Sequence, residues 1–150
     1  MAILSWGKCV IEYATSKDGA AGTEWKEIDT PKEDTTKLTP TAGTEKTATE
    51  EGGELVDSRT GKNTFQFEFD LFVKKGKERP FEDIDGQISG EYAFRLTPED
   101  EENEGLLIER SSLRCEESYS TADGKLLHYV AKVLKPATGK SVKPYIKGQA

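Results

Sequence analysis

The stretch "NTFQFEFDLFVKKG", residues 63–76, alternates apolar and polar side chains over most of its length. One set of alternate positions is apolar: Phe65, Phe67, Phe69, Leu71 and Val73. The intervening set is polar, Gln66, Glu68 and Asp70, and only Phe72 breaks the pattern. Successive side chains of a β-strand point to opposite faces. The alternation therefore predicts a strand with one face on a core and the other in water.

Shorter stretches on both sides have the same character. In "GKCVIEYA", residues 7–14, Cys9, Ile11 and Tyr13 share a predicted face. Four later segments are also compatible with strands: "EYAFRLTP" (91–98), "GLLIERSSLRCEESYS" (105–120), "KLLHYVAKVLKP" (125–136) and "VKPYIKG" (142–148). Asp123–Gly124 favours a tight hairpin turn between the second and third of these.

One segment differs from the strands. "RPFEDIDGQI", residues 79–88, predicts a short helix, with Pro80 in its first turn and Gly86 at its end. A chain of 150 residues is typical of one domain, here residues 1–150. Because 34% of residues are hydrophobic and 33% are charged, we expect a lean core and a polar surface. The predicted fold is mainly β, a single-domain sandwich or barrel with one short helix.

Charge is distributed unevenly along the chain. Residues 125–150 contain six lysines and no acid. All 28 acids therefore lie in residues 1–124, with 21 − 6 = 15 bases, so that part carries −13 and the end carries +6, summing to −7. An acidic body with a basic end fits a head-to-tail contact between copies, and solvated charges on separate strands fit it equally. Within the basic segment 136–150, the candidate inter-subunit charge contacts are Lys140, Lys143 and Lys147.

Motifs for catalysis or ligand binding are weak. "ATGKS" (137–141) has Leu134 where a phosphate-binding loop requires glycine. A calcium loop over residues 81–92 would place Phe81 and Tyr92 at positions that require carboxylates. The single histidine, His128, lies in an apolar run, where a packed or half-exposed strand position explains it. We therefore expect no enzyme activity, no cofactor and no metal.

Targeting and redox features also limit the interpretation. The start, "MAILSWGKCVIEY", has no basic region and too short an apolar run for a signal peptide. No segment approaches the eighteen or so apolar residues of a membrane span, so no membrane partner is expected. Cys9 and Cys115 lie far apart in sequence, and we expect reduced, buried thiols rather than a disulfide.

The segment "TAGTEKTATEEGGE", residues 41–54, contains no Val, Ile, Leu, Met or aromatic residue, yet it is rich in threonine. One interpretation is a loop that is mobile in the free subunit, because no apolar side chain anchors it. The other is a strand that is polar on both faces and becomes ordered on assembly. In that strand, one face would carry Glu45, Thr47, Thr49 and Glu51.

The order of these segments resembles the tail tube proteins of long-tailed phages. The likeness rests on four stretches: "LSWGKCVIEY" (4–13), "WKEIDTPKEDTTKLTPTAGTEKTATEEGGE" (25–54), "NTFQFEFDLFV" (63–73) and "TADGKLLHYVAKVLKP" (121–136). That family shares its fold with the tube protein of type VI secretion. The resemblance covers most of the chain as an order of elements and includes no catalytic motif.

The resemblance implies a non-enzymatic β subunit with a flanking helix. Six subunits would form a ring, rings would stack into a hollow tube with other tail proteins, and DNA would pass through the lumen without tight binding. The implied location is the cytoplasm during assembly and then the virion tail. On this basis, Glu45, Thr47, Thr49 and Glu51 are candidates for the lumen, where an acidic wall repels phosphate.

A second class of function remains open on the residues. A β-sandwich that binds carbohydrate or a protein could use Trp6, Trp25 and the tyrosines as stacking platforms. For both tryptophans, we expect packing in the core instead.

Overall fold

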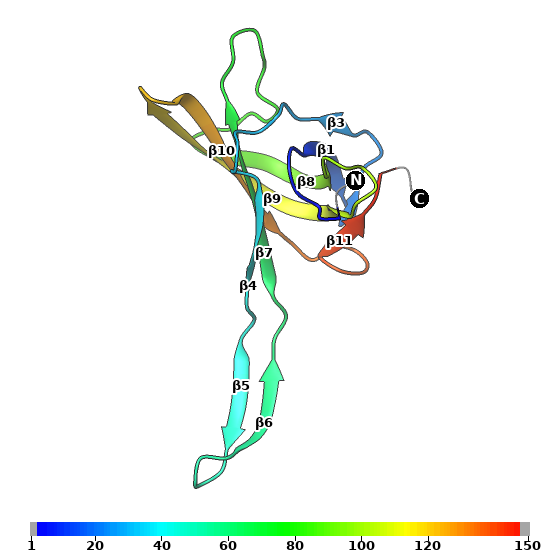
Figure 1. Ribbon diagram of the computed structural model, residues 1–150, viewed down its shortest axis with the longest axis vertical. Helices are drawn as coiled ribbons and strands as arrows, with labels where there is room; N and C mark the ends of the chain where they lie inside the picture. The colour runs from blue at the N-terminus through cyan, green and yellow to red at the C-terminus, as the bar shows by residue number, and fades with distance from the viewer. Residues whose placement is uncertain (1–2, 148–150) are drawn as a thin grey trace.

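The computed structural model describes residues 3–147, whose only regular elements are β-strands (Figure 1). In chain order, they are β1 (Val10–Lys17), β2 (Ala20–Ala21), β3 (Lys26–Glu27), β4 (Lys37–Thr41), β5 (Glu45–Thr49), β6 (Leu55–Thr60), β7 (Thr64–Phe72), β8 (Gln87–Thr97), β9 (Gly105–Ser120), β10 (Gly124–Val133) and β11 (Val142–Tyr145). The expectation of a mainly β fold is confirmed.

Nine of the strands form one antiparallel sheet in the order β2-β1-β8-β9-β10-β7-β4. β3 pairs with β1, and β11 pairs with the start of β9. The sheet curls into a half-barrel, with the long strands β8, β9 and β10 at its centre (Figure 1). β4 is an edge strand, which explains how Pro40 is accommodated without a backbone N–H.

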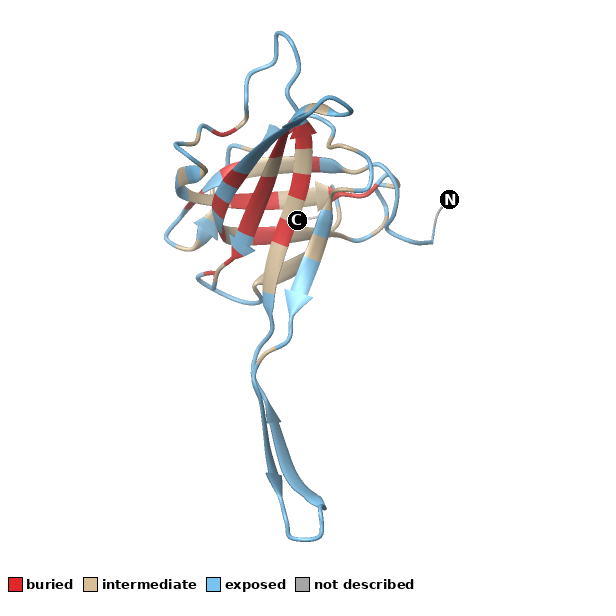
Figure 2. Ribbon diagram, turned by 90° about the vertical axis from the view of Figure 1, so that its left-hand side faces the viewer, coloured by how far each residue is buried: buried red, intermediate tan, exposed pale blue. Residues whose placement is uncertain are grey.

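The core lies on the inner face of the curled sheet, where the buried positions gather (Figure 2). The predicted alternation of β7 is confirmed, since Phe67, Phe69 and Leu71 are buried there. Phe69 pairs with Tyr129 of β10 and also contacts the ring of Phe94, with ring centroids 5.5 Å and 6.1 Å away. These aromatic contacts join three strands that are distant in sequence.

The β9–β10 hairpin also follows the prediction. Ser120 pairs with Gly124 across a short turn, and Gly124 adopts a φ of 76°, a conformation that glycine tolerates well. Beyond the turn, the two strands stay in register to Val133 opposite Ser111. Because this pairing runs through the centre of the sheet, it fixes which residues of β10 face the core.

The predicted helix at residues 79–88 is wrong. Asp85 and Gly86 both have positive φ, 51° and 89°, and form a tight turn in which Ile84 and Gln87 exchange backbone hydrogen bonds. Before that turn, Phe81 is 2% exposed and packs its ring 4.6 Å from that of Tyr13. An Asp-Gly pair favours a two-residue hairpin turn, so the segment instead covers one side of the core.

Replacing Phe69 with alanine should lower the free energy of unfolding by about 3–5 kcal/mol, because the large cavity would lie among three aromatic rings. Phe72→Ala is the matched control on the same strand. Since Phe72 is 39% exposed, its loss should cost less than about 1 kcal/mol. Urea denaturation of both variants measures the difference, and equal losses would contradict the assignment of the inner face.

Candidate assembly surface

The most unusual feature of the molecule is an arm, residues 44–60, formed by β5, β6 and their connecting turn. It projects from the body as a narrow two-stranded ribbon (Figure 1), and every residue in it is exposed (Figure 2). β5 and β6 pair only with each other in the described chain. At about 3.3 Å per strand residue, the arm extends roughly 25 Å beyond the sheet.

Two glycines form the neck of the arm, between the β4–β7 pair and the β5–β6 pair. A Cβ placed on Gly43 would lie 2.4 Å from the carbonyl carbon of Gly61, so no larger residue fits there without movement of the backbone. Gly61 donates its N–H to the carbonyl of Thr44 at 2.7 Å, and Asn63 accepts the N–H of Gly43 at 3.2 Å. The neck therefore brings the two strands of the arm close together.

The faces of the arm differ in charge. Thr47 lies opposite Ser58, while Glu45 lies opposite Thr60, so these residues form a face rich in hydroxyls. On the other face, Lys46 lies directly opposite Arg59. Like charges at paired positions destabilise a sheet, and an isolated two-stranded hairpin is at best marginally stable in water. The arm therefore has little stability of its own.

The predicted strand ends earlier than the sequence interpretation placed it. β5 ends at Thr49, so Glu45, Thr47 and Thr49 share a face within the strand, whereas Glu51 lies in the turn at the tip. The turn is closed by a bond from the N–H of Glu50 to the carbonyl of Glu54, 2.9 Å long. A polar strand is thus present at residues 45–49, and the mobility of the segment in the free subunit remains a prediction.

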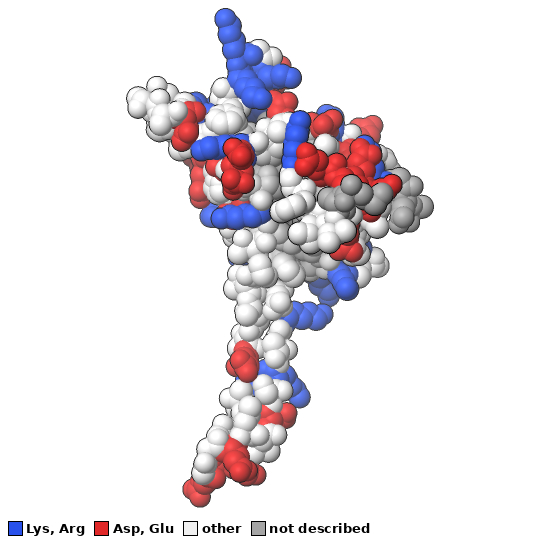
Figure 3. All heavy atoms as spheres, viewed as in Figure 1, with Lys and Arg blue, Asp and Glu red and all other residues white. Residues whose placement is uncertain are grey.

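The tip combines acid and apolar groups. Three exposed carboxylates gather there, on Glu50, Glu51 and Glu54, and the arm ends in red in Figure 3. Leu55 and Val56 follow at once and are 60% and 58% exposed. The register shifts at this point, because Thr49 pairs with Leu55 and Ala48 pairs with Asp57. Val56 is therefore left without a cross-strand partner on the arm.

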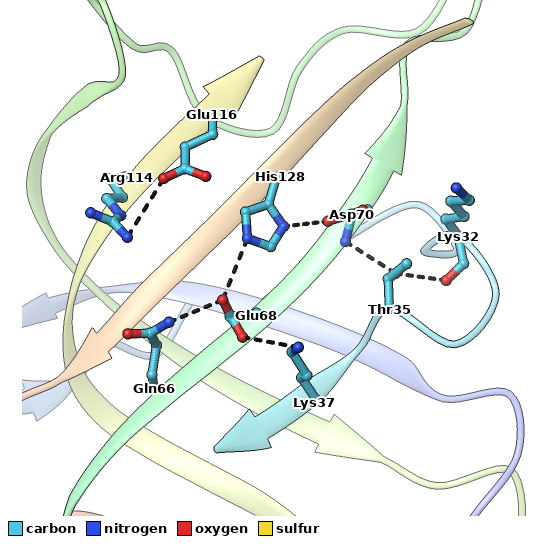
Figure 4. Close-up of polar contacts among 9 residues, drawn as sticks. All are labelled: Lys32, Thr35, Lys37, Gln66, Glu68, Asp70, Arg114, Glu116 and His128. Carbon is cyan, nitrogen blue, oxygen red and sulfur yellow. Dashed lines mark hydrogen bonds and ion pairs between the residues drawn. The ribbon is translucent and has the colours of Figure 1, made fainter. Parts of the chain in front are cut away.

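The strands from which the arm departs are held by a polar network on the outer face of the sheet (Figure 4). His128 of β10 contacts Asp70 and lies 3.4 Å from Glu68, both on β7. Lys37 of β4 lies 3.6 Å from Glu68, and Thr35 accepts the N–H of Asp70 at 3.2 Å. His128 is thus the half-exposed strand histidine expected, and its contacts help to hold β4, β7 and β10 together.

The structure places the three candidate lysines of the C-terminal segment in different surroundings. Lys143 lies 2.7 Å from Glu109, and Lys147 lies 3.2 Å from Glu101, both within the chain. Lys140 is exposed in the loop before β11 and takes part in no ion pair with the described residues. Their contacts with other subunits remain a prediction, and two of the three already have intramolecular partners.

Other reactive groups give no second site. A depression of about 450 Å³ is lined by Asp83, Asp85, Gly86, Cys115 and Glu117. Burial raises the pKa of Cys115 to about 11, so its thiol is protonated at neutral pH and is a poor nucleophile. Within residues 3–147, no cluster of His, Cys, Asp or Glu could hold a metal ion. Both cysteines are free, as predicted, although Cys9 is only partly buried.

The expectation that both tryptophans pack in the core is wrong. Trp6 is 67% exposed, beside a groove of about 590 Å³ between residues 5–9 and 30–36. Trp25 is partly buried, but its ring lies against the guanidinium of Arg95, 4.4 Å away, rather than in the core. Arg95 also forms an ion pair with Glu12, at 2.9 Å. Trp25 therefore stacks against Arg95 at the surface, whereas the indole of Trp6 is open to solvent.

Comparison with known proteins gives no assignment: no family model matches the chain, and no curated protein matches it in sequence. Among the described residues, no helix has the length and apolar character required to cross a membrane. The arm is the most exposed part of the molecule and is therefore the candidate site. In the sequence, its strand was indicated only by the threonines of residues 41–54, a segment with no Val, Ile, Leu, Met or aromatic residue.

In a dilute monomer, amide hydrogens of the arm should exchange at least about a hundredfold faster than those at the centre of β7, because the arm buries nothing. Hydrogen–deuterium exchange resolved by peptide measures this directly. The matched comparison is the β9–β10 hairpin, which is also a two-stranded connection but belongs to the main sheet. Equal protection in the arm and β7 would show that the arm is stable without a partner.

Proposed function

We propose that the protein is a structural subunit of a hollow tube of the phage-tail type, which conducts DNA and assembles as stacked rings. The observation that carries the proposal is the arm. It is a fully exposed ribbon whose strands pair only with each other and do not pack against the body of the described chain. In this proposal, contact with other copies supplies the missing partner, six subunits close each ring, and other tail proteins bind the ends of the tube.

The curled sheet supports the same function. Its long antiparallel strands form a half-barrel that is open at both edges, with β4 at one edge and the short β2 and β3 at the other. Unpaired edges are templates for contact with another chain. A ring made by such heterologous contacts closes when the rotation between neighbours is a whole fraction of a turn. The subunit would then complete its sheet only in the assembly.

The hydroxyl-rich face of the arm is the proposed lining of the lumen. Glu45, Thr47 and Thr49 lie on it, opposite Thr60, Ser58 and Leu55, and the face carries no base. Affinity for DNA comes largely from lysine and arginine that neutralise phosphates. A wall with hydroxyls and a carboxylate offers no such neutralisation, so DNA would slide through it. Glu51, at the tip, would contribute charge at the end of the wall.

Excision of the arm should abolish tubes and leave the fold intact. Because Gly43 and Gly61 lie face to face, residues 44–60 can be replaced by an Asn-Gly turn without opening the β4–β7 pair. Negative-stain electron microscopy at high concentration should show annular particles or tubes for the full chain and none for the variant. The free energy of unfolding of the monomer should change by less than about 0.5 kcal/mol.

Tyr119→Ala provides a control that alters an exposed residue of the body while keeping the arm. Tubes that form normally from the excised variant would contradict the role of the arm. Particles of monomer size from the full chain at every concentration would favour the alternative class of function described next.

Trp6 favours that alternative, a non-catalytic module that binds carbohydrate or a protein. Its indole is exposed beside the groove, where the polar residues Lys8, Lys32 and Asp34 are also found. Aromatic rings beside a shallow groove are suited to stacking on the apolar face of a sugar. Trp25 is less suited, because Arg95 covers its ring.

Tryptophan fluorescence separates the two classes. If the tube function is correct, soluble oligosaccharides should leave the emission of Trp6 unchanged, because its indole would have no sugar ligand. Trp6→Phe should remove the solvent-exposed component of the emission without changing the assembly. Saturable quenching by a sugar that Trp6→Phe abolishes would instead support the binding module.

A further inference from the structure

β7 connects two ends of the molecule that differ in charge. The arm precedes β7 in the chain, and a turn over residues 73–79 follows it. Because β7 is a single extended strand of nine residues, roughly 30 Å long, these two features must lie at its opposite ends. Figure 1 shows the arm at the bottom of the molecule and the turn, in green, at the top.

The end opposite the arm is basic. We call residues 73–79 the basic loop: Lys74, Lys75 and Lys77 are exposed in it and outnumber its single acid, Glu78. The N–H of Lys77 donates to the carbonyl of Lys74 at 3.2 Å, closing a turn that presents these side chains to solvent. The basic loop forms the blue upper end of Figure 3, whereas the arm ends in acid.

The lysines of the basic loop have weak internal partners or none. Lys77 lies 3.9 Å from Asp29, and both side chains are largely exposed. Lys74 and Lys75 take part in no ion pair with the rest of the described chain. At the arm tip, Glu50, Glu51 and Glu54 likewise take part in none. Each end therefore presents charge that its own chain leaves available.

An exposed apolar pair adjoins the charges at each end. Leu55 and Val56 follow the acidic turn of the arm. Phe72 and Val73 precede the lysines of the basic loop and are 39% and 40% exposed. Protein interfaces commonly have an apolar centre with a polar rim. The two ends are thus opposite in charge, and each has an exposed apolar pair beside its charged groups.

We propose that the arm tip of one copy docks on the basic loop of a second copy, head to tail along the long axis. Leu55 and Val56 would pack against Phe72 and Val73, and the carboxylates of residues 50–54 would pair with the lysines of residues 74–77. This contact rests on the proposed self-assembly and adds to it the surface that stacks one copy on the next.

The contact is heterologous, because the two surfaces lie on different parts of the chain. A heterologous contact that translates along an axis continues without closing, so it builds length, whereas the sheet edges would build rings. Each contact is small and its charges are exposed, so it is weak alone. Two rings that meet through several such contacts bind far more tightly, because the contacts act together.

The C-terminal lysines fit this role less well. Lys143 and Lys147 have intramolecular partners. The segment that carries them runs along β9 in the body, beside β8, rather than at either end of the long axis (Figure 1). Lys140 has no such partner and remains available for contacts along the side of the subunit. The acidic tip is therefore best matched by the basic loop.

Zero-length carbodiimide cross-linking of an equal mixture of ¹⁴N- and ¹⁵N-labelled full-length protein tests the contact. Mass spectrometry should find mixed-isotope links from Glu50, Glu51 or Glu54 to Lys74, Lys75 or Lys77. Within one chain, the two ends lie more than about 50 Å apart, given the lengths of β7 and the arm, so these links can form only between copies. Their absence at the highest concentration, or links from the tip to other lysines instead, would overturn the proposal.

Charge reversal supplies an independent test. E50K/E51K/E54K and K74E/K75E/K77E should each reduce the assembled fraction at least about tenfold, because attraction becomes repulsion at every contact. The chain that carries all six substitutions should recover assembly, since its tip is then basic and its loop acidic. The control K8E/K132E/K135E makes the same charge change at exposed lysines that have no ion pairs and lie outside the sheet edges, the arm and the basic loop, and it should assemble normally.

Circular dichroism confirms that each variant is folded before its assembly is compared. Loss of assembly in both reversed variants without recovery in the combined one would show that the two surfaces do not meet. Hollow tubes without the expected cross-links would overturn the contact and leave the tube function intact. Cross-linked filaments that lack a lumen would support the contact and contradict the tube.

Discussion

The packing of Phe69 against Tyr129 holds the structure together at the point on which the rest depends. This pair joins β7 to β10 in register, and Phe94 brings β8 into the same contact. Once Phe67, Phe69 and Leu71 face inward, period-two geometry requires Glu68 and Asp70 to face outward. The orientation of β7 therefore determines both the core and the polar network that holds together β4 and β7, the strands from which the arm departs.

Sequence reasoning predicted the elements in which residue chemistry and periodicity agree. The alternation over β7 and the Asp-Gly hairpin before β10 are local signals, and both are confirmed. The prediction of a helix at residues 79–88 was wrong because proline and glycine are typical of turns as well as of helix ends. In addition, the burial of Phe81 depends on aromatic rings from distant parts of the chain. The prediction that Trp6 packs in the core was wrong for a similar reason. The presence of a large apolar residue does not show whether another part of the chain will cover it.

The candidate site was predictable only in part. Threonines in residues 41–54 indicated a strand, but β6 contains no matching pattern, and their pairing over the Gly43–Gly61 neck is a long-range feature. The distribution of charge along the sequence led to a wrong expectation of which end of the molecule is basic. Counting along the chain placed the basic end at the C-terminus, whereas folding gives Lys143 and Lys147 acidic partners and leaves a middle segment as the exposed basic end.

Under the proposed self-assembly, an arm with little stability of its own would make assembly depend on protein concentration and on neighbouring copies. Fixing the backbone of a residue costs about 1–2 kcal/mol of entropy, and the arm recovers none of it by burial within its own chain. A partner surface that binds Leu55 and Val56 would supply the missing apolar contact, so ordering of the arm and docking would be one event. With Lys46 opposite Arg59, the free arm is further destabilised. Such a subunit would stay monomeric when dilute and elongate only where several basic loops are already displayed together, which favours growth on an existing ring over random aggregation.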